Sequence, residues 1–191
     1  MRAAWTLLAT LLATPALAQT VTERLQTCVA CHGQTGTSEV ENVPSLGAMP
    51  VNYTLTQLYL FREKIRLADP MNAMAEGLTD DDLRSLGATF NAMPPPTPAA
   101  ELPAAEREAG QALVEKYHCG SCHMPNLAGQ QTIPHIAGQR EDYLQRSLVA
   151  YKANTRKGYS PAMNEASQEI QDEDIPVLAR YIASFRESTA N

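Results

Sequence analysis

A five-residue motif that occurs twice constrains the fold of this chain more than any other feature. Residues 28–32 read Cys-Val-Ala-Cys-His, and residues 119–123 read Cys-Gly-Ser-Cys-His. Two thiols three residues apart lie on one side of a helical turn, where each can add to one vinyl group of a haem. The adjoining histidine then presents its imidazole to the haem iron. The motifs predict covalent haem attachment through Cys28, Cys31, Cys119 and Cys122, with His32 and His123 as iron ligands.

Three other uses of cysteine agree less well with this sequence. A disulfide framework pairs cysteines across loops, whereas all four cysteines here belong to the repeated motif. A zinc site built from two Cys-x-x-Cys pairs normally separates them by about 15–20 residues, far less than the separation found here. A thioredoxin-like redox pair expects a βαβ context, and no alternating strand pattern is visible. Covalent haem is therefore the favoured interpretation.

The repeat extends well beyond the cysteine motifs. Pro44 corresponds to Pro134, and residues 71–90 correspond to 163–182, at a nearly constant offset of about 90 residues. Matching periods of this kind indicate two copies of one domain. Between the copies lies a segment with five prolines, which is typical of a stiff, extended linker. We expect haem domains at 19–92 and 104–191, joined by a Pro-rich linker at 93–103.

The first residues are typical of an export signal. Arg2 precedes an apolar run, and residues 16–18 read Ala-Leu-Ala, a site of the kind that signal peptidase cuts. A transmembrane anchor is disfavoured, because the run is much shorter than the roughly 20 residues needed to span a bilayer. We therefore expect a signal peptide at 1–18, cleavage after Ala18 and a periplasmic location, with no transmembrane segment in the mature chain.

Helical signals recur in both copies. Thr20, Thr54 and Thr79 each stand where a helix is expected to begin, and the acids at 80–82 suit the first turn of the third helix. Apolar positions in these segments keep roughly helical spacing. In the second copy, helices are expected near 104–118, 141–153 and 172–185. The sequence predicts an all-α fold, repeated twice.

The size of each copy also favours a prosthetic group. Domains this small bury little apolar surface and often need a metal or another group that stabilises the fold. A large apolar macrocycle supplies the missing core, so we expect the chain to fold poorly without haem.

Charge bears on the partners. The chain has 191 residues and a formal net charge of −6, without the cluster of basic residues that nucleic acid binding requires. We therefore expect no nucleic acid partner. Lys152, Arg156 and Lys157 form a small basic spot, which we expect to face either a haem propionate or a partner protein.

The second axial ligand of each iron is expected to be a methionine. Only Met71 and Met163 occupy equivalent places in the two copies, just after Pro70 and Pro161. They are therefore the predicted ligands, with Met74 as the rival in the first copy. Histidine and methionine together fill both axial positions, which leaves no site for oxygen or a substrate and favours electron exchange alone.

These residues resemble the di-haem class I cytochromes c, most closely cytochrome c4. The resemblance rests on residues 28–33, on Pro-His-Ile-Ala-Gly-Gln at 134–139, and on a Met-x6-Leu/Ile-x-Asp-x-Asp pattern in both halves. It implies two haem domains related by pseudo-twofold symmetry, with haems close enough for rapid transfer. It also implies that the carbonyls of Pro44 and Pro134 orient the proximal histidines.

The first half departs from that family pattern. Gly-Ala-Met-Pro at 47–50 stands where the family usually has Ala-Gly-Gln. In this respect the half is similar to the cytochrome subunit of flavocytochrome c sulfide dehydrogenase, which works bound to a flavoprotein. The departure leaves the packing of the domains and the choice of partner open.

Three functional hypotheses follow. The first is a periplasmic electron carrier between a respiratory complex or dehydrogenase and a terminal acceptor such as a membrane-bound oxidase. The second is a haem-bearing subunit of a dehydrogenase that oxidises, for example, sulfide or thiosulfate. The third is an enzyme such as a di-haem peroxidase, which the two matched methionines disfavour because such an enzyme needs an open axial position. The sequence favours an electron-transfer protein with no catalytic residues.

Overall fold

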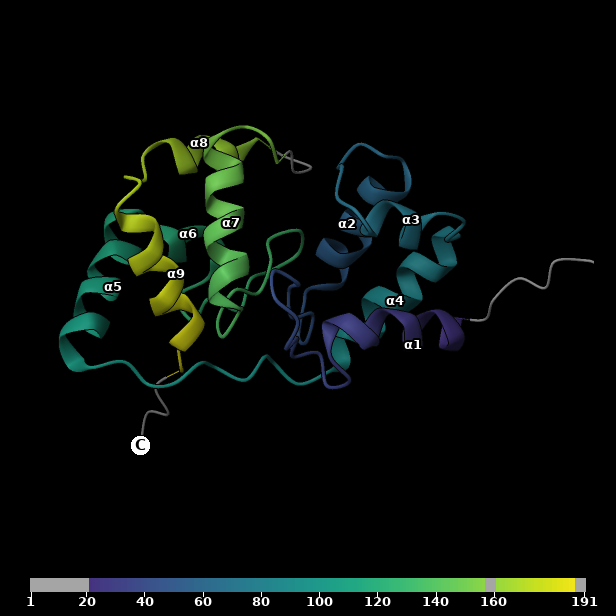
Figure 1. Ribbon diagram of the computed structural model, residues 1–191, viewed down its shortest axis with the longest axis horizontal. Helices are drawn as coiled ribbons and strands as arrows, with labels where there is room; N and C mark the ends of the chain where they lie inside the picture. Colours follow the sequence, from purple (N-terminus) through teal and green to yellow (C-terminus); the bar gives the residue numbers. More distant parts are fainter. Residues whose placement is uncertain (1–20, 157–160, 188–191) are drawn as a thin grey trace, which may run out of the picture.

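The fold is entirely helical over the residues described by the computed structural model, 21–156 and 161–187. Within these ranges the only β-type pairing is an isolated bridge between Gln130 and Ile133. Figure 1 shows the helices in two groups that lie side by side, joined along one edge by a single extended segment. The prediction of an all-α fold is confirmed.

The first helical group contains four helices: α1 (Val21–His32), α2 (Val51–Arg62), α3 (Met71–Ala75) and α4 (Asp80–Ala92). Helix α4 packs against both α1 and α2, and α3 packs against α2. The apolar stripe of α4 lies inside this group because Leu83, Leu86 and Phe90 share one helical face. The buried core residues of the group are Val29, Leu58, Phe61, Ala75, Leu78, Leu83, Leu86 and Phe90.

The second helical group contains α5 (Ala104–Lys116), α6 (Cys119–His123), α7 (Glu141–Lys152), α8 (Ala162–Gln168) and α9 (Asp174–Ser184). Helix α9 packs against both α5 and α7, and its buried face joins their cores. Helices α5 and α9 approach closely at Gly110, where an added Cβ atom would lie 2.3 Å from the Cβ atom of Tyr181. A side chain at position 110 therefore cannot be accommodated without moving one helix.

The helix starts agree with the sequence in one case and differ in another. Thr79 caps α4 and forms a complete capping box with Asp82, as its position predicts. The prediction that Thr54 opens a helix is wrong, because α2 begins at Val51, directly after Pro50. The ring of Pro50 fixes its φ angle and has no N–H, which suits a helix start. Thr20 lies outside the described residues.

The long helices of the second group lie within about two residues of the predicted ranges, whereas the short helices were not predicted. Helices α3, α6 and α8 are too short to show an apolar period. The second cysteine motif forms its own helix because His118, with a φ angle of 53°, separates α6 from α5. In the first group the motif instead ends the continuous helix α1.

The segment at 93–103 lies outside the helices and touches both groups (Figure 1). The N–H of Thr97 donates to Oγ1 of Thr37 in the first group at 3.2 Å. The N–H of Ala99 donates to the carbonyl of Ala183 in the second group at 2.8 Å. No helix within the described ranges is both long enough and apolar enough to cross a membrane.

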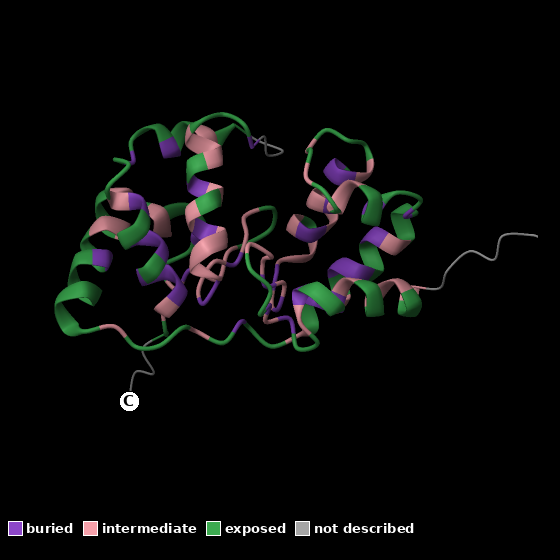
Figure 2. Ribbon diagram, viewed as in Figure 1, coloured by how far each residue is buried: buried purple, intermediate pink, exposed green. Residues whose placement is uncertain are grey.

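Loops form most of the contact between the groups. Over the described residues, helix–helix packing stays within each group. Hydrogen bonds from the loop before α2 reach the start of α7, as between the N–H of Asn42 and the carboxylate of Asp142 at 2.9 Å. Figure 2 shows buried positions in the helices of both groups and also in the loops between them. Polar contacts therefore set how the two groups lie against each other.

Candidate haem sites

The two motif histidines have the same environment. His32 ends α1 and His123 ends α6, and both side chains are buried. Nδ1 of His32 lies 2.8 Å from the carbonyl oxygen of Pro44, and Nδ1 of His123 lies 2.9 Å from that of Pro134. Because a carbonyl oxygen only accepts, Nδ1 carries the proton, which leaves the lone pair on Nε2. The orienting contacts implied by the family resemblance are both present.

Burial keeps both imidazoles neutral. Desolvation lowers the pKa of His32 and of His123, and the hydrogen bond to the proline carbonyl opposes this only in part. A neutral imidazole whose Nδ1 is fixed by a carbonyl is the usual form of a metal-binding histidine. The donor set therefore fits a haem iron.

The four cysteines are unpaired thiols, as covalent attachment to haem requires. Cys28 and Cys119 are half-buried, and burial raises the pKa of both thiols. Cys31 and Cys122 are exposed. In the first group Cys28 packs against the apolar core, so its thiol lies where an apolar macrocycle would meet the protein.

The methionines differ in how far they enter the core. Met71 is the first residue of α3 and packs against the core of the first group. Met163 lies in the first turn of α8 and packs against Leu148 and its neighbours in the second group. Met74, the rival ligand, is 46% exposed. The ligand assignment remains a prediction at this point.

An asparagine follows each of the two methionines and fixes the loop before it. Nδ2 of Asn72 donates to the carbonyls of Phe61 and Arg66, both at 2.8 Å. Nδ2 of Asn164 donates to the carbonyls of Tyr151 and Arg156, both at 2.9 Å. Sequence reasoning missed these residues, although a Met-Asn pair stands at the same place in both copies.

The loop held by Asn164 carries a buried arginine. Arg156 is only 9% exposed, and its Nη1 donates to Oγ of Ser147 at 2.5 Å. Its guanidinium lies over the ring of Tyr151 at 4.6 Å and donates from Nη2 to the hydroxyl of Tyr53 in the other group at 3.3 Å. Nε of Arg156 is buried without a partner.

This arrangement corrects the expected basic spot at 152–157. Lys152 is engaged by Asp172 and by the carbonyl of Ile170, and Lys157 lies outside the described residues. Arg156 is buried between the two groups and is not on a basic surface. The ring of Tyr151 and the loop held by Asn164 determine the position of Arg156. The charge pattern of the sequence indicates neither of them.

A second arginine completes a crossed arrangement between the groups. Arg66 of the first group stacks on Phe61 at 4.5 Å, and its guanidinium is close enough to Tyr143 of the second group to lower the pKa of that tyrosine. Burial raises the pKa of Tyr143, but the guanidiniums of Arg156 and Arg66 outweigh it and lower that pKa to about 7. We call Tyr53, Arg66, Tyr143 and Arg156 the crossed cluster.

The crossed cluster has positive charge without a matching acid. Within the described residues no Asp or Glu forms an ion pair with Arg66 or Arg156, and the sequence outside those ranges contains no Asp or Glu. Buried charges are normally paired. The orphaned Nε and the unpaired guanidiniums therefore fit carboxylates from outside the chain, such as those of haem propionates.

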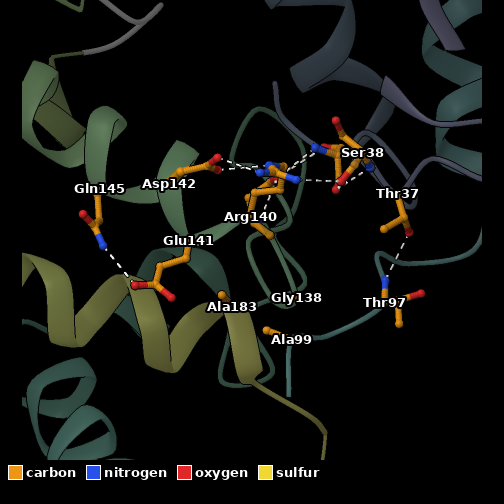
Figure 3. A pocket seen from close by; sticks show the side chains of 12 residues that line it. Thr37, Ser38, Thr97, Ala99, Gly138, Arg140, Glu141, Asp142, Gln145 and Ala183 are labelled. Carbon is orange, nitrogen blue, oxygen red and sulfur yellow. Dashed lines mark hydrogen bonds and ion pairs between the residues drawn. The ribbon is translucent and has the colours of Figure 1, made fainter. Parts of the chain in front are cut away.

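A cavity of about 500 Å³ opens on another part of the interface. Residues of both groups and of the segment at 93–103 line it (Figure 3). Arg140 points across it toward Asp142 and the carbonyl of Ser38, at 2.6 Å and 3.3 Å. Because Arg140 and Asp142 already pair with each other, we interpret this cavity as part of the domain contact and not as a ligand site.

Comparisons with known proteins agree with this geometry. A family model described as Cytochrome c matches residues 107–186. Cytochrome c4 of Thiocapsa roseopersicina is 30% identical, over 81% of this chain and 85% of that protein. The thiosulfate dehydrogenase electron acceptor of Stutzerimonas stutzeri (strain A1501) is also 30% identical, over 82% of this chain and 78% of that protein.

A solved structure shares the whole architecture. Reduced recombinant cytochrome c4 from Pseudomonas stutzeri matches with a TM-score of 0.78 and 25% identity, over 87% of this chain and 97% of that chain. Two helical domains, each with a Cys-x-x-Cys-His motif that ends in a buried histidine, define a c-type cytochrome. More narrowly, the chain belongs to the cytochrome c4 family of di-haem class I cytochromes c. It is an electron-transfer protein with two covalently bound haem c groups.

Proposed function

We propose that this protein is a periplasmic electron carrier whose two irons each have one histidine and one methionine ligand. His32 and Met71 hold the first iron, and His123 and Met163 hold the second. The observation that carries the proposal is the pair of buried, neutral histidines, each with Nδ1 on a proline carbonyl and Nε2 free for iron. The packing of half-buried Met71 against the core, compared with the exposure of Met74, supports the methionine assignment.

The cysteines and the domain bounds belong to the same proposal. Cys28 and Cys31 attach the first haem, within a domain at 19–92, and Cys119 and Cys122 attach the second, within a domain at 104–191. The Pro-rich linker is the segment at 93–103. The matched bonds of Asn72 and Asn164 support two copies of one domain, since each asparagine holds the equivalent loop. The opposed Tyr53–Arg156 and Arg66–Tyr143 pairs across the interface support a pseudo-twofold relation between the copies.

Bound haem supplies the one-electron chemistry, and the chain determines how it is used. His32 and Met71 would hold the first haem iron and His123 and Met163 the second, which would leave neither iron a position for a substrate. Thioether ligation favours the reduced iron and raises its potential. The guanidiniums of the crossed cluster would compensate the charge of the haem propionates. Bound haems would supply electron exchange with each other and with partner proteins, with no covalent bond made or broken.

Export and haem content can be tested together. The full-length chain is produced in cells that export and mature c-type cytochromes, and the intact protein is weighed by mass spectrometry. We expect the mass of a chain that begins at Gln19 and carries two haems. A product with one haem, or one that keeps residues 1–18, contradicts this part of the proposal. A Cys119→Ala/Cys122→Ala variant serves as the control, because it should lose one haem and keep the other.

A second candidate function follows from one relative. A protein 30% identical to this chain is named thiosulfate dehydrogenase electron acceptor. The alternative is therefore that this chain accepts electrons as the haem subunit of a dehydrogenase, for example one that oxidises thiosulfate or sulfide. Purification from the native host distinguishes the two: a free carrier elutes alone, whereas a subunit elutes with a stoichiometric dehydrogenase.

A further inference from the structure

Gln139 of the second domain bonds the backbone of Ser45 in the first domain, through the two peptide groups on either side of the Ser45 Cα atom. Its Oε1 accepts from the N–H of Ser45 at 2.8 Å, and its Nε2 donates to the carbonyl of Ser45 at 2.9 Å. Both residues are buried, with Gln139 only 3% exposed and Ser45 fully enclosed. An amide side chain thus pairs with the backbone as a neighbouring strand would. A contact this enclosed persists as long as the two domains stay together.

The first of these two peptide groups, Pro44–Ser45, also orients the histidine of the first haem. The N–H of Ser45 and the carbonyl of Pro44 belong to the same planar peptide unit. That carbonyl accepts from Nδ1 of His32 at 2.8 Å. One conjugated unit therefore joins Gln139 of the second domain to the proximal histidine of the first. A hydrogen bond to the N–H end polarises the unit and makes its oxygen a stronger acceptor.

The surrounding bonds prevent Gln139 from turning away. Its Oε1 also accepts from the N–H of Arg140 at 3.0 Å. Oγ of Ser45 accepts from the N–H of Ser38 at 3.0 Å, and the hydroxyl of Ser38 donates to the carbonyl of Cys31 at 2.8 Å. Figure 3 shows the side chain of Arg140 pointing toward Ser38, whose carbonyl it bonds at 3.3 Å. The contact is thus fixed at the Gln139 end by Arg140, and at the Ser45 end by Ser38, which bonds the residue before His32.

The other domain has no equivalent contact. Met49 occupies the place of Gln139: its N–H donates to the carbonyl of Leu46 at 3.3 Å, as the N–H of Gln139 donates to that of Ile136 at 3.1 Å. Met49 is buried but has no amide with which to bond the peptide group that follows Pro134. The glutamine contact in the described structure therefore serves the first haem and not the second.

We propose that Gln139 is a positioning residue for the first haem, acting across the domain interface through the Pro44–Ser45 peptide group. This inference rests on the proposed ligation of that haem by His32. A stronger acceptor at Pro44 increases the electron donation of the imidazole, which favours the oxidised iron and lowers its potential. Gln139 therefore makes the two haems unequal and links the potential of the first to the contact between the domains.

The test uses the holoprotein with a Gln139→Met substitution, which copies the residue at position 49. We expect the midpoint potential of the first haem to rise, with a roughly two- to tenfold increase in its ratio of reduced to oxidised iron at fixed potential, which is the worth of one hydrogen bond. The second haem should keep its midpoint. Gln145→Met is the matched control. Gln145 lies on α7 and, like Gln139, lines the cavity of about 500 Å³ at the interface, but it bonds only Glu141 among the described residues.

Haem-methyl resonances in proton NMR spectra assign each midpoint to its haem during the titration. Unchanged midpoints in Gln139→Met, or equal shifts at both haems, overturn the inference. Intact mass and helical circular dichroism are measured on the same samples. Two retained haems show that the variant has matured, so that a midpoint change tests Gln139 alone, whereas a wild-type chain without two haems shows that the proposed function itself has failed.

A second measurement needs no variant. In the reduced, diamagnetic wild-type protein, the Nδ1 proton of His32 should resonate further downfield than that of His123, because its acceptor is the more polarised carbonyl. Equal shifts for the two protons contradict the inference even if Gln139→Met does not mature.

Discussion

Arg156 donates from Nη2 to the hydroxyl of Tyr53 at 3.3 Å, across 103 positions of the sequence and across the boundary between the domains. The guanidinium of Arg66 acts on Tyr143 in the reverse direction, from the first domain to the second. Each domain therefore contributes one arginine and one tyrosine to the interface. Because neither arginine pairs with an acid among the described residues, the interface fits carboxylates from outside the chain, such as those of haem propionates.

Removal of the charge of Arg156 should affect both haems. In Arg156→Gln we expect both midpoint potentials to fall, because a buried cation beside the propionates no longer favours the reduced state. The free energy of unfolding should also drop by about 3 kcal/mol, as when one member of a buried ion pair is removed. Redox titration and thermal unfolding of the holoprotein measure the two effects. Arg146→Gln removes an exposed charge from α7, the helix before Arg156, and should change neither.

Carbon monoxide binding distinguishes the proposed ligands Met71 and Met163 from the alternative ligand Met74. Met71→Ala should open the first iron, lower its potential and allow carbon monoxide to bind when it is reduced. Met163→Ala should do the same at the second iron. Met74→Ala should have neither effect, because Met74 is largely exposed. A Met74→Ala variant that binds carbon monoxide would reverse the assignment in the first domain.

The asparagines should determine how firmly the methionines stay on iron. Asn164→Ala removes two hydrogen bonds that hold the loop before Met163. We expect the methionine–iron bond of the second haem to be about 2 kcal/mol easier to break, from two bonds of ordinary net strength. The charge-transfer absorption of that bond, followed through a denaturant titration, measures the loss. Gln168→Ala removes exposed contacts on the same helix and should leave the denaturant midpoint of this absorption unchanged.

The capping box of α4 gives a pH dependence with a defined sign. The N–H of Thr79 holds the pKa of Asp82 below its ordinary value. A lowered folded pKa means that this stabilisation is present above the unfolded pKa and is lost as the pH falls through the folded pKa. Asp82→Asn should therefore lower the melting temperature at pH 7, and the difference from wild type should shrink below about pH 4.

Two variants complete the test of the capping box. Thr79→Ala should lose about 1 kcal/mol, as expected for an N-cap threonine. Asp81→Asn removes a neighbouring acid that pairs only with exposed Arg84 and is the matched control. A melting difference for Asp82→Asn that stays constant down to pH 2 contradicts the assigned role of the carboxylate.

The sequence predicted the features that recur in both domains, but it did not predict the contacts between the domains. The two Cys-x-x-Cys-His motifs and the capping box at Thr79 are local patterns, so the haem class and several helices followed from them. The pairs Tyr53–Arg156 and Ser45–Gln139 each join the two domains, and no local pattern indicates such contacts. Thr54 misled because its capping pattern also occurs inside a helix that a proline had already begun.

Axial ligation is the central claim, and an optical redox titration of the wild-type holoprotein, repeated under carbon monoxide, tests it most directly. Two low-spin haems at positive potentials, neither affected by carbon monoxide, are the predicted result, since each iron then holds one histidine and one methionine. A haem that binds carbon monoxide, or that titrates far below the other, would contradict the account and show that Met71 or Met163 is not a ligand.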